Sequence, residues 1–313
     1  MSPTTIPGNF VLQSPTTSKV VVVNDQRNPP GDAQITYGIT SAGGTFNLRS
    51  TGTVDYEVEW GDGTVERSTS NVLAHTYAAG NYVLKIRTSQ QYVPYFNNST
   101  DEDQITSVAL VSDLGVGTDL TSAWFGANNM TTFDAASGVT SSVINFTNTW
   151  LNCTSLTSFP LINTSSGTNF QNAWYNCPSL TSFPLIDTSS GTNLASAWAY
   201  CTSLTSFPLI DTSSGTTFFN SWGSCYNLAS FPANMFDTTG TLILSAFNST
   251  WTNCALTAQS IENILVSLDT NGATGIILSI NGGANAGQSS WTAAATTAYN
   301  NLIAKGWTIT ANP

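Results

Sequence analysis

The sequence predicts a multidomain α+β protein. A short β domain precedes a solenoid of about six units with a 24-residue period, and an α/β cap closes the far end. Three observations predict this architecture. A nearly verbatim repeat runs through the middle of the chain, polar and apolar residues alternate before it, and a helix–strand–helix–strand pattern follows it. With 41% hydrophobic residues among 313, the chain can bury a sizeable core.

Residues 1–36 are predicted to form an N-terminal arm or anchor. The beginning of this segment is polar and rich in Pro and Thr. It lacks the basic and apolar regions of a signal peptide, so no signal peptide is expected. The run Lys19–Asn24 is typical of a strand. Two interpretations stay open: this strand docks on another subunit by edge addition, or it is an extra strand of the β domain that follows.

Alternating polar and apolar residues predict half-buried strands in the β domain, residues 37–89. Val54–Thr64, which ends in Trp-Gly-Asp-Gly-Thr, is followed by His75–Ile86, which contains His-Thr-Tyr and Gly-Asn-Tyr. This pair of motifs resembles the PKD domain, an immunoglobulin-like β-sandwich, and the resemblance implies a spacer or a protein-contact role. His75, the only histidine, is then a strand residue beside the core, and Asp62 forms a turn.

The repeats are predicted over residues 120–256, after a linker and N-terminal cap at 90–119. The segment at 152–162 recurs almost unchanged at 24-residue intervals. In each unit a very short extended segment follows the apolar stripe, and a turn follows that segment. Gly191 lies in one of these turns, and a left-handed backbone is expected there. The apolar residues of one unit are spaced i, i+3, i+4 and i+7, which predicts a short helix; an example is Phe170, Ala173, Trp174 and Cys177.

Stacking of these units predicts a continuous core into which each Trp and the Cys three residues later project. Cysteines at equivalent positions of successive units lie too far apart for ideal disulfide geometry, and their number, five, is odd. We interpret them as buried thiols rather than as disulfides or metal ligands. The predicted core residues are Trp150, Cys153, Trp174, Cys177, Trp198, Cys201, Trp222 and Cys225.

The repeated motif Phe/Leu-x3-Trp-x2-Cys-x2-Leu-x2-Phe-Pro-Leu-Ile-Asp-Thr-Ser resembles the BspA-like leucine-rich repeats of bacterial surface proteins and some phage proteins. In this chain Trp stands where Met or Phe is more usual. The resemblance implies a leucine-rich-repeat solenoid, and residues 257–313 resemble its C-terminal cap. Helices are expected at Ser260–Leu268 and Ser290–Lys305, and strands at Gly275–Ile280 and Trp307–Thr310.

Hydroxyl residues align along the repeats and form the candidate ligand or partner face. A flat row of hydroxyl groups suits weak hydrogen-bonding recognition of glycans or proteins; the alternative is a solvated face without a ligand. Three tyrosines beside the apolar stripe, Tyr175, Tyr200 and Tyr226, are further candidates that could stack against sugars. The face consists of Thr157, Ser158, Thr181, Ser182, Thr205 and Ser206.

Asn163, Asp187, Asp211 and Asp237 also occupy equivalent repeat positions. Stacked carboxylates are oxygen ligands that suit Ca²⁺, so Asp187 and Asp211 are the candidate calcium ligands. No metal is expected, however, because each side chain more simply caps its own turn. A repeating ladder offers identical environments, whereas a glycosidase needs two different carboxylates. No catalytic residue and no cofactor are therefore predicted.

Only 8% of the residues are charged and the net charge is −11, which argues against nucleic acid or an anionic membrane as a partner. No apolar stretch predicts membrane insertion. With the resemblance, these features predict a non-enzymatic phage virion surface protein: a tail fibre, an adhesin or a capsid decoration protein. Its N-terminal region would contact other virion proteins, its solenoid would face a host glycan or protein, and it could form homo-oligomers. The alternatives are a BspA-like adhesin on a bacterial cell surface and a carbohydrate-active enzyme.

Overall fold

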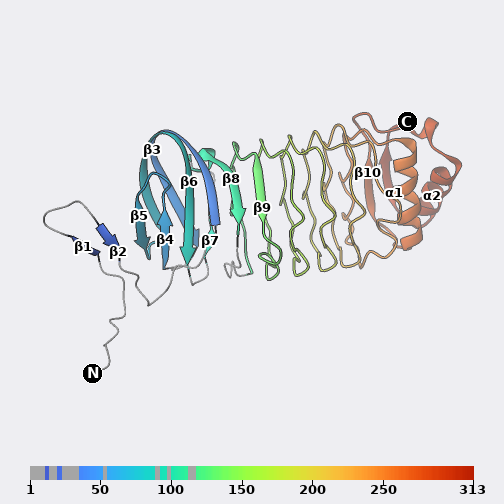
Figure 1. The fold of residues 1–313 in the computed structure, drawn as a ribbon. Coiled ribbons are helices and arrows are strands. Elements are labelled where there is room, and N and C mark those ends of the chain that lie inside the picture. The colour runs from blue at the N-terminus through green and yellow to red at the C-terminus, as the bar shows by residue number, and fades with distance from the viewer. Residues whose placement is uncertain are drawn as a thin grey trace, which may run out of the picture.

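A computed structural model gives an elongated molecule with a β-sheet at one end and two helices at the other (Figure 1). Most of the predicted arm, residues 1–36, lies outside the described residues. Val11–Gln13 (β1) and Val20–Val22 (β2) pair antiparallel in a sheet of their own, so β2 is not a further strand of the larger sheet. The structure describes residues 11–13, 20–22, 35–51, 55–88, 92–96, 100–111 and 118–313.

The larger sheet contains seven strands and is mixed, with the order β5-β4-β6-β3-β8-β9 and with β7 paired to β3. The predicted two-layer sandwich is therefore wrong. A single sheet continues past residue 89 because β8 pairs with both β3 and β9, and β9 already belongs to the first coil. The strands are β3 (Ile35–Thr51), β4 (Tyr56–Glu59), β5 (Val65–Ser68), β6 (Val72–Thr88), β7 (Val93–Pro94), β8 (Ile105–Leu110) and β9 (Thr132–Ala135), and a 3₁₀ turn, η1 (Glu102–Gln104), precedes β8.

The long antiparallel pair of β3 and β6 forms the centre of this sheet. The two strands pair antiparallel from Ile35 opposite Ile86 to Arg49 opposite Val72. Alternate residues of β3 are buried at both ends of the strand, as a half-buried strand requires. In its middle, Gly43 and Gly44 have φ values of 95° and 144°, a region that favours glycine.

Between the sheet and the C-terminal helices the chain forms successive coils, each named after its Trp, and those from Trp150 to Trp222 repeat every 24 residues (Figure 1). Successive coils are joined by isolated parallel bridges along the column Asp119, Asn145, Asn169, Asn193 and Thr217. The prediction of an α+β leucine-rich-repeat solenoid is wrong: the molecule is mostly β, and α1 (Ala258–Asn271) and α2 (Ala293–Ala304) are the only α-helices among the described residues.

Tandem β-turns replace the predicted helix in each coil. In the Trp198 coil, the turns Leu194–Ala197 and Trp198–Cys201 are each closed by a hydrogen bond of 3.2 Å from the last N–H to the first carbonyl. Their third residues, Ser196 and Tyr200, have φ values of 55° and 63°, as in type II turns. An α-helix excludes positive φ. The apolar stripe thus faces the core from tandem β-turns and not from a helix.

Neighbouring coils complete the hydrogen bonding of these turns. Every second N–H of the segment donates to a carbonyl of the next coil, so a single coil cannot satisfy its own backbone and depends on its neighbours. In the Trp198 coil the donors are Leu194, Ser196, Trp198 and Tyr200 and the acceptors are Thr217, Phe219, Ser221 and Gly223, at 2.8–3.1 Å.

Gly191 does not have the expected left-handed backbone, since it is absent from the described glycines with positive φ. Its role is steric. A Cβ at this position would lie 3.0 Å from the carbonyl oxygen of Thr188 and 3.2 Å from the ring of Phe170. The glycine therefore lets the turn pack closely against the preceding coil.

Aromatic columns fill the coils. Adjacent Trp rings are stacked with centroids 5.3–5.8 Å apart, and Phe rings approach them edge to face. One hydrophobic cluster runs from the sheet through the coils to the C-terminal cap. The Trp column consists of Trp124, Trp150, Trp174, Trp198, Trp222 and Trp251.

The cap covers the open end of this core. Helix α1 begins at the N-cap Thr257, whose side chain accepts a hydrogen bond from the N–H of Ser260, and ends at Gly272 with a φ of 81°. Its Ser260 hydroxyl donates to the carbonyl of Ala229. The strands β10 (Ile277–Ile280) and β11 (Thr308–Ala311) pair in parallel, with η2 (Gln288–Ser290) and α2 between them. The Trp307 ring stacks on Phe247 and so extends the aromatic columns into the cap.

Candidate functional site

The six residues of the predicted face lie side by side on three successive coils, and all of them are exposed. Each pair stands between a buried Leu and a buried Phe, such as Leu156 and Phe159, which hold the segment on the core. The N–H of Thr181 donates to the carbonyl of Thr157 at 3.4 Å, so equivalent hydroxyl residues follow one another along the stack. We call this set the hydroxyl ladder: Thr157, Ser158, Thr181, Ser182, Thr205 and Ser206.

The hydroxyl ladder itself carries no formal charge. The segments 150–158, 174–182 and 198–206 contain no Asp, Glu, Lys, Arg or His, and the exposed Asp187 and Asp211 follow the ladder residues of their coils five positions later in the chain. The ladder can therefore offer hydrogen bonds and apolar contacts, but it cannot offer ion pairs.

An apolar column runs beside the hydroxyl ladder. Leu161, Leu185 and Leu209 follow the repeated Phe-Pro pair and are 69%, 61% and 50% exposed. Sequence reasoning did not single these residues out, although their 24-residue spacing and the buried Ile after each of them indicate an outward position. They add apolar contact area to the face.

The eight predicted core residues are all fully buried. Each of the five thiols donates a hydrogen bond to the carbonyl of the Trp in the preceding coil, at 3.1–3.3 Å. All five cysteines are free. Burial raises the pKa of Cys201 and of Cys254 to about 12, so these thiols stay protonated near neutral pH. Their contacts are those of small core residues.

The cysteines are expected to be inert towards thiol reagents in the folded protein. A thiolate is the reactive form, and burial suppresses both its formation and its access to reagent. At pH 8, Ellman's reagent should label none of the five thiols natively and all five in guanidinium chloride. Labelling of the native protein within minutes would mean that the coils open on that timescale.

Asp187 and Asp211, the candidate calcium ligands, act as turn acceptors. Oδ1 of Asp187 accepts hydrogen bonds from the hydroxyl (2.6 Å) and the N–H (3.0 Å) of Ser189, and these bonds lower its pKa. Oδ1 of Asp211 accepts from the N–H of Ser213 at 2.8 Å. In the part of the chain that the structure describes, no three His, Cys, Asp or Glu residues gather in a way that could hold a metal ion.

The other two members of that row have different partners. Oδ1 of Asn163 accepts from Ser165, which repeats the turn of the acidic residues. Asp237 instead accepts a hydrogen bond from the hydroxyl of Ser267 on α1. Asn163, Asp187 and Asp211 thus accept hydrogen bonds within their own turns, whereas Asp237 accepts one from the cap.

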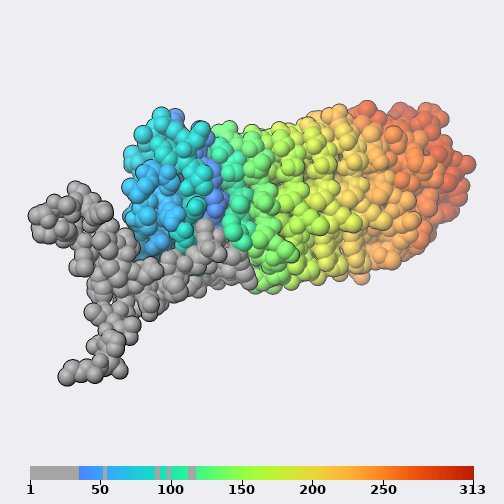
Figure 2. Space-filling view, viewed as in Figure 1, coloured from blue at the N-terminus to red at the C-terminus, as the bar shows by residue number. Residues whose placement is uncertain are grey.

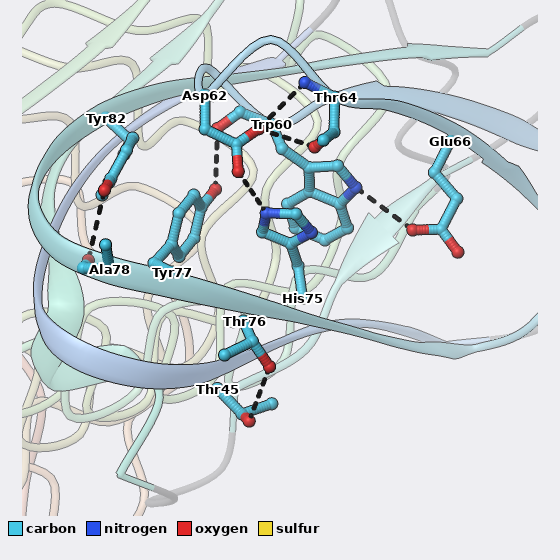
Figure 3. Close-up of polar contacts among 10 residues, drawn as sticks. All are labelled: Thr45, Trp60, Asp62, Thr64, Glu66, His75, Thr76, Tyr77, Ala78 and Tyr82. Carbon is cyan, nitrogen blue, oxygen red and sulfur yellow. Dashed lines mark hydrogen bonds and ion pairs between the residues drawn. The ribbon is translucent and has the colours of Figure 1, made fainter.

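A second polar cluster lies on the sheet, around the only histidine (Figure 3). The His75 ring stacks on Trp60 with centroids 4.4 Å apart, and its Nε2 lies 2.8 Å from Oδ2 of Asp62. The indole N–H of Trp60 donates to Glu66, and the Tyr77 hydroxyl donates to the carbonyl of Trp60. These contacts fasten the turn between β4 and β5 to β6.

The stability of this sheet is expected to fall between about pH 4 and pH 2 as Asp62 becomes protonated. Hydrogen bonds from Thr64, and then the contact with His75, lower the pKa of Asp62 from 3.8 to about 2. Because the folded-state pKa is depressed, the stabilisation is complete above the unfolded value of 3.8 and is lost as the pH falls through 2. Thermal melts of the wild type and of Asp62→Asn should converge over this range. A constant difference between them would contradict the assignment.

Within the described residues, no helix is long and apolar enough to cross a membrane. No protein-family model matches the chain, and neither a curated protein nor a solved structure matches it significantly. The resemblance of its motifs to PKD domains and BspA-like repeats therefore stays a prediction from the sequence.

Proposed function

We propose that the chain is a non-enzymatic surface protein of a phage virion, in which the coils present the hydroxyl ladder to a host surface or to another protein. One observation carries this proposal: a row of exposed, uncharged hydroxyl side chains on three hydrogen-bonded coils. Repeat proteins bind partners through extended surfaces of this kind, to which each repeat contributes.

The shape of the molecule suits display. A β-sheet covers one end of the coils and the α/β cap covers the other, and the coils form the surface of the elongated body between them in the view of Figure 2. Stacked aromatic rings and backbone hydrogen bonds link each coil to the next. In this proposal the N-terminal region contacts other virion proteins, and the coils face outward.

Immunogold labelling tests the location. Serum against the recombinant chain is applied to purified phage particles and to whole cells from the same source, with pre-immune serum as the control. We expect gold on the particles; its position on head or tail distinguishes a decoration protein from a tail fibre or adhesin. Gold confined to the cell envelope would overturn the virion assignment in favour of a bacterial adhesin.

A further inference from the structure

We infer that three tyrosines on successive coils, Tyr175, Tyr200 and Tyr226, form a binding site for a neutral saccharide; Tyr175 and Tyr200 precede the ladder residues of their coils by six and five positions in the chain. We call these residues the tyrosine cluster. The inference rests on the proposed recognition function and names its ligand class and site. Tyr200 and Tyr226 are 38% and 51% exposed, and Tyr175 is half-buried.

The first two rings are in contact. The ring centroids of Tyr175 and Tyr200 lie 5.2 Å apart, with the ring planes tilted by 56°. Burial and the neighbouring Tyr200 raise the pKa of Tyr175, so its hydroxyl stays neutral near pH 7. The pair offers aromatic surface and phenolic hydroxyl groups without charge.

The third tyrosine lies along the same stretch of backbone. Tyr226 stands between Cys225, whose thiol donates to the carbonyl of Trp198, and Asn227, whose side chain donates to the carbonyl of Thr202. Its backbone therefore runs beside Thr202, two residues after Tyr200 in the Trp198 coil. The Tyr175–Tyr200 ring pair is the centre of the cluster, and Tyr226 lies on the next coil.

The backbone conformation of Tyr200 is unfavourable for a tyrosine. Its φ of 63° is a left-handed conformation, which is strained for a bulky residue. Its side chain gains only partial burial in return. Strain of this kind points to a role in function. The equivalent residues of the other coils are Gly126, Asn152, Asn176, Ser224 and Asn253, which are small or amide residues.

The chemistry of the surroundings selects a neutral saccharide. No Lys or Arg occurs between Arg87 and Lys305, so sulfated, phosphorylated or sialylated ligands would meet no counter-charge. Pyranose rings present apolar C–H faces that stack on aromatic rings, and their hydroxyl groups exchange hydrogen bonds with Thr, Ser and Tyr hydroxyls. Between them, the tyrosine cluster and the hydroxyl ladder offer both kinds of contact, and none of their side chains is acidic or basic.

Residues at equivalent positions of other coils provide substitutions that test this site and that the fold already accommodates. Tyr200→Asn installs the residue found at this position in the Trp150 and Trp174 coils, and Tyr226→Thr installs the equivalent of Thr202. Both variants should melt at or above the wild-type temperature. As a control, Leu244→Ser removes a side chain that is 64% exposed and lies outside the cluster.

The full-length protein and these variants are tested on a printed array of neutral and acidic saccharides. We expect binding only to neutral spots, a loss of about tenfold or more in apparent affinity for each tyrosine variant, and no change for Leu244→Ser. Absence of binding, binding to acidic spots, or equal binding by the tyrosine variants would overturn the inference. Because the array does not depend on location, its result is separate from that of the immunogold experiment.

Discussion

Trp198→Ala is expected to lower the free energy of unfolding by about 3–5 kcal/mol, because it is a large-to-small change in a tightly packed core. The Trp198 side chain is fully buried. It stacks between Trp174 and Trp222 at centroid distances of 5.5 and 5.4 Å, and Phe207 meets it edge to face. Removing it leaves a cavity at the centre of a column that flanking coils cannot fill without breaking their own backbone hydrogen bonds.

Guanidinium chloride titration followed by near-ultraviolet circular dichroism measures this effect. Trp198→Phe keeps an aromatic ring in the column and should cost clearly less than the alanine variant. An unchanged unfolding midpoint for Trp198→Ala would show that the column is not the core of the coils.

Asn172→Val is expected to lower the free energy of unfolding by about 2–3 kcal/mol. Asn172 has a φ of 54°, which a β-branched residue adopts only under strain. Its side-chain amide also donates to Oδ1 of Asn148 in the preceding coil at 3.0 Å, and valine cannot replace that bond. The backbone strain and the lost hydrogen bond both weaken the tandem turns through which neighbouring coils are joined.

Asn172→Gly is the matched control, since glycine adopts positive φ freely and loses only the side-chain bond. It should cost about 1 kcal/mol or less. The two variants are compared by thermal and chemical unfolding under the same conditions. Equal losses would mean that backbone conformation does not limit this position.

The recurring Asn residues of the coils distinguish β-turns from a helix, which the apolar spacing does not. Apolar spacing of i, i+3, i+4 and i+7 fits a short helix, but it fits tandem β-turns equally well. The distinguishing signal is the Asn or Ser two residues before the Trp of each coil and, in four of the six coils, also two residues after it, as in Asn172 and Asn176. Asn is among the few non-glycine residues that occupy the left-handed region readily. Its recurrence argues against a helix.

In the β domain, the motifs around Trp60 and His75 identify a β region but cannot indicate how many sheets it forms. That depends on β8, which pairs with β3 on one side and with β9 of the first coil on the other. Such pairing joins segments far apart in the chain and leaves no local pattern. The contact of His75 with Asp62 arises in the same way, since β6 carries the histidine to the turn between β4 and β5.

The sequence by itself determined the interval of the repeat, the residues available to fill a core, and the row of hydroxyl residues that lies on the surface, because all three are properties of residue type and spacing. Only the tertiary structure decided that the repeats are turns rather than helices and that the β domain is a single sheet. The physical reason is that a 24-residue coil obtains much of its backbone hydrogen bonding from its neighbours. The favoured backbone conformation is therefore a property of the stack, and it is not specified within one repeat.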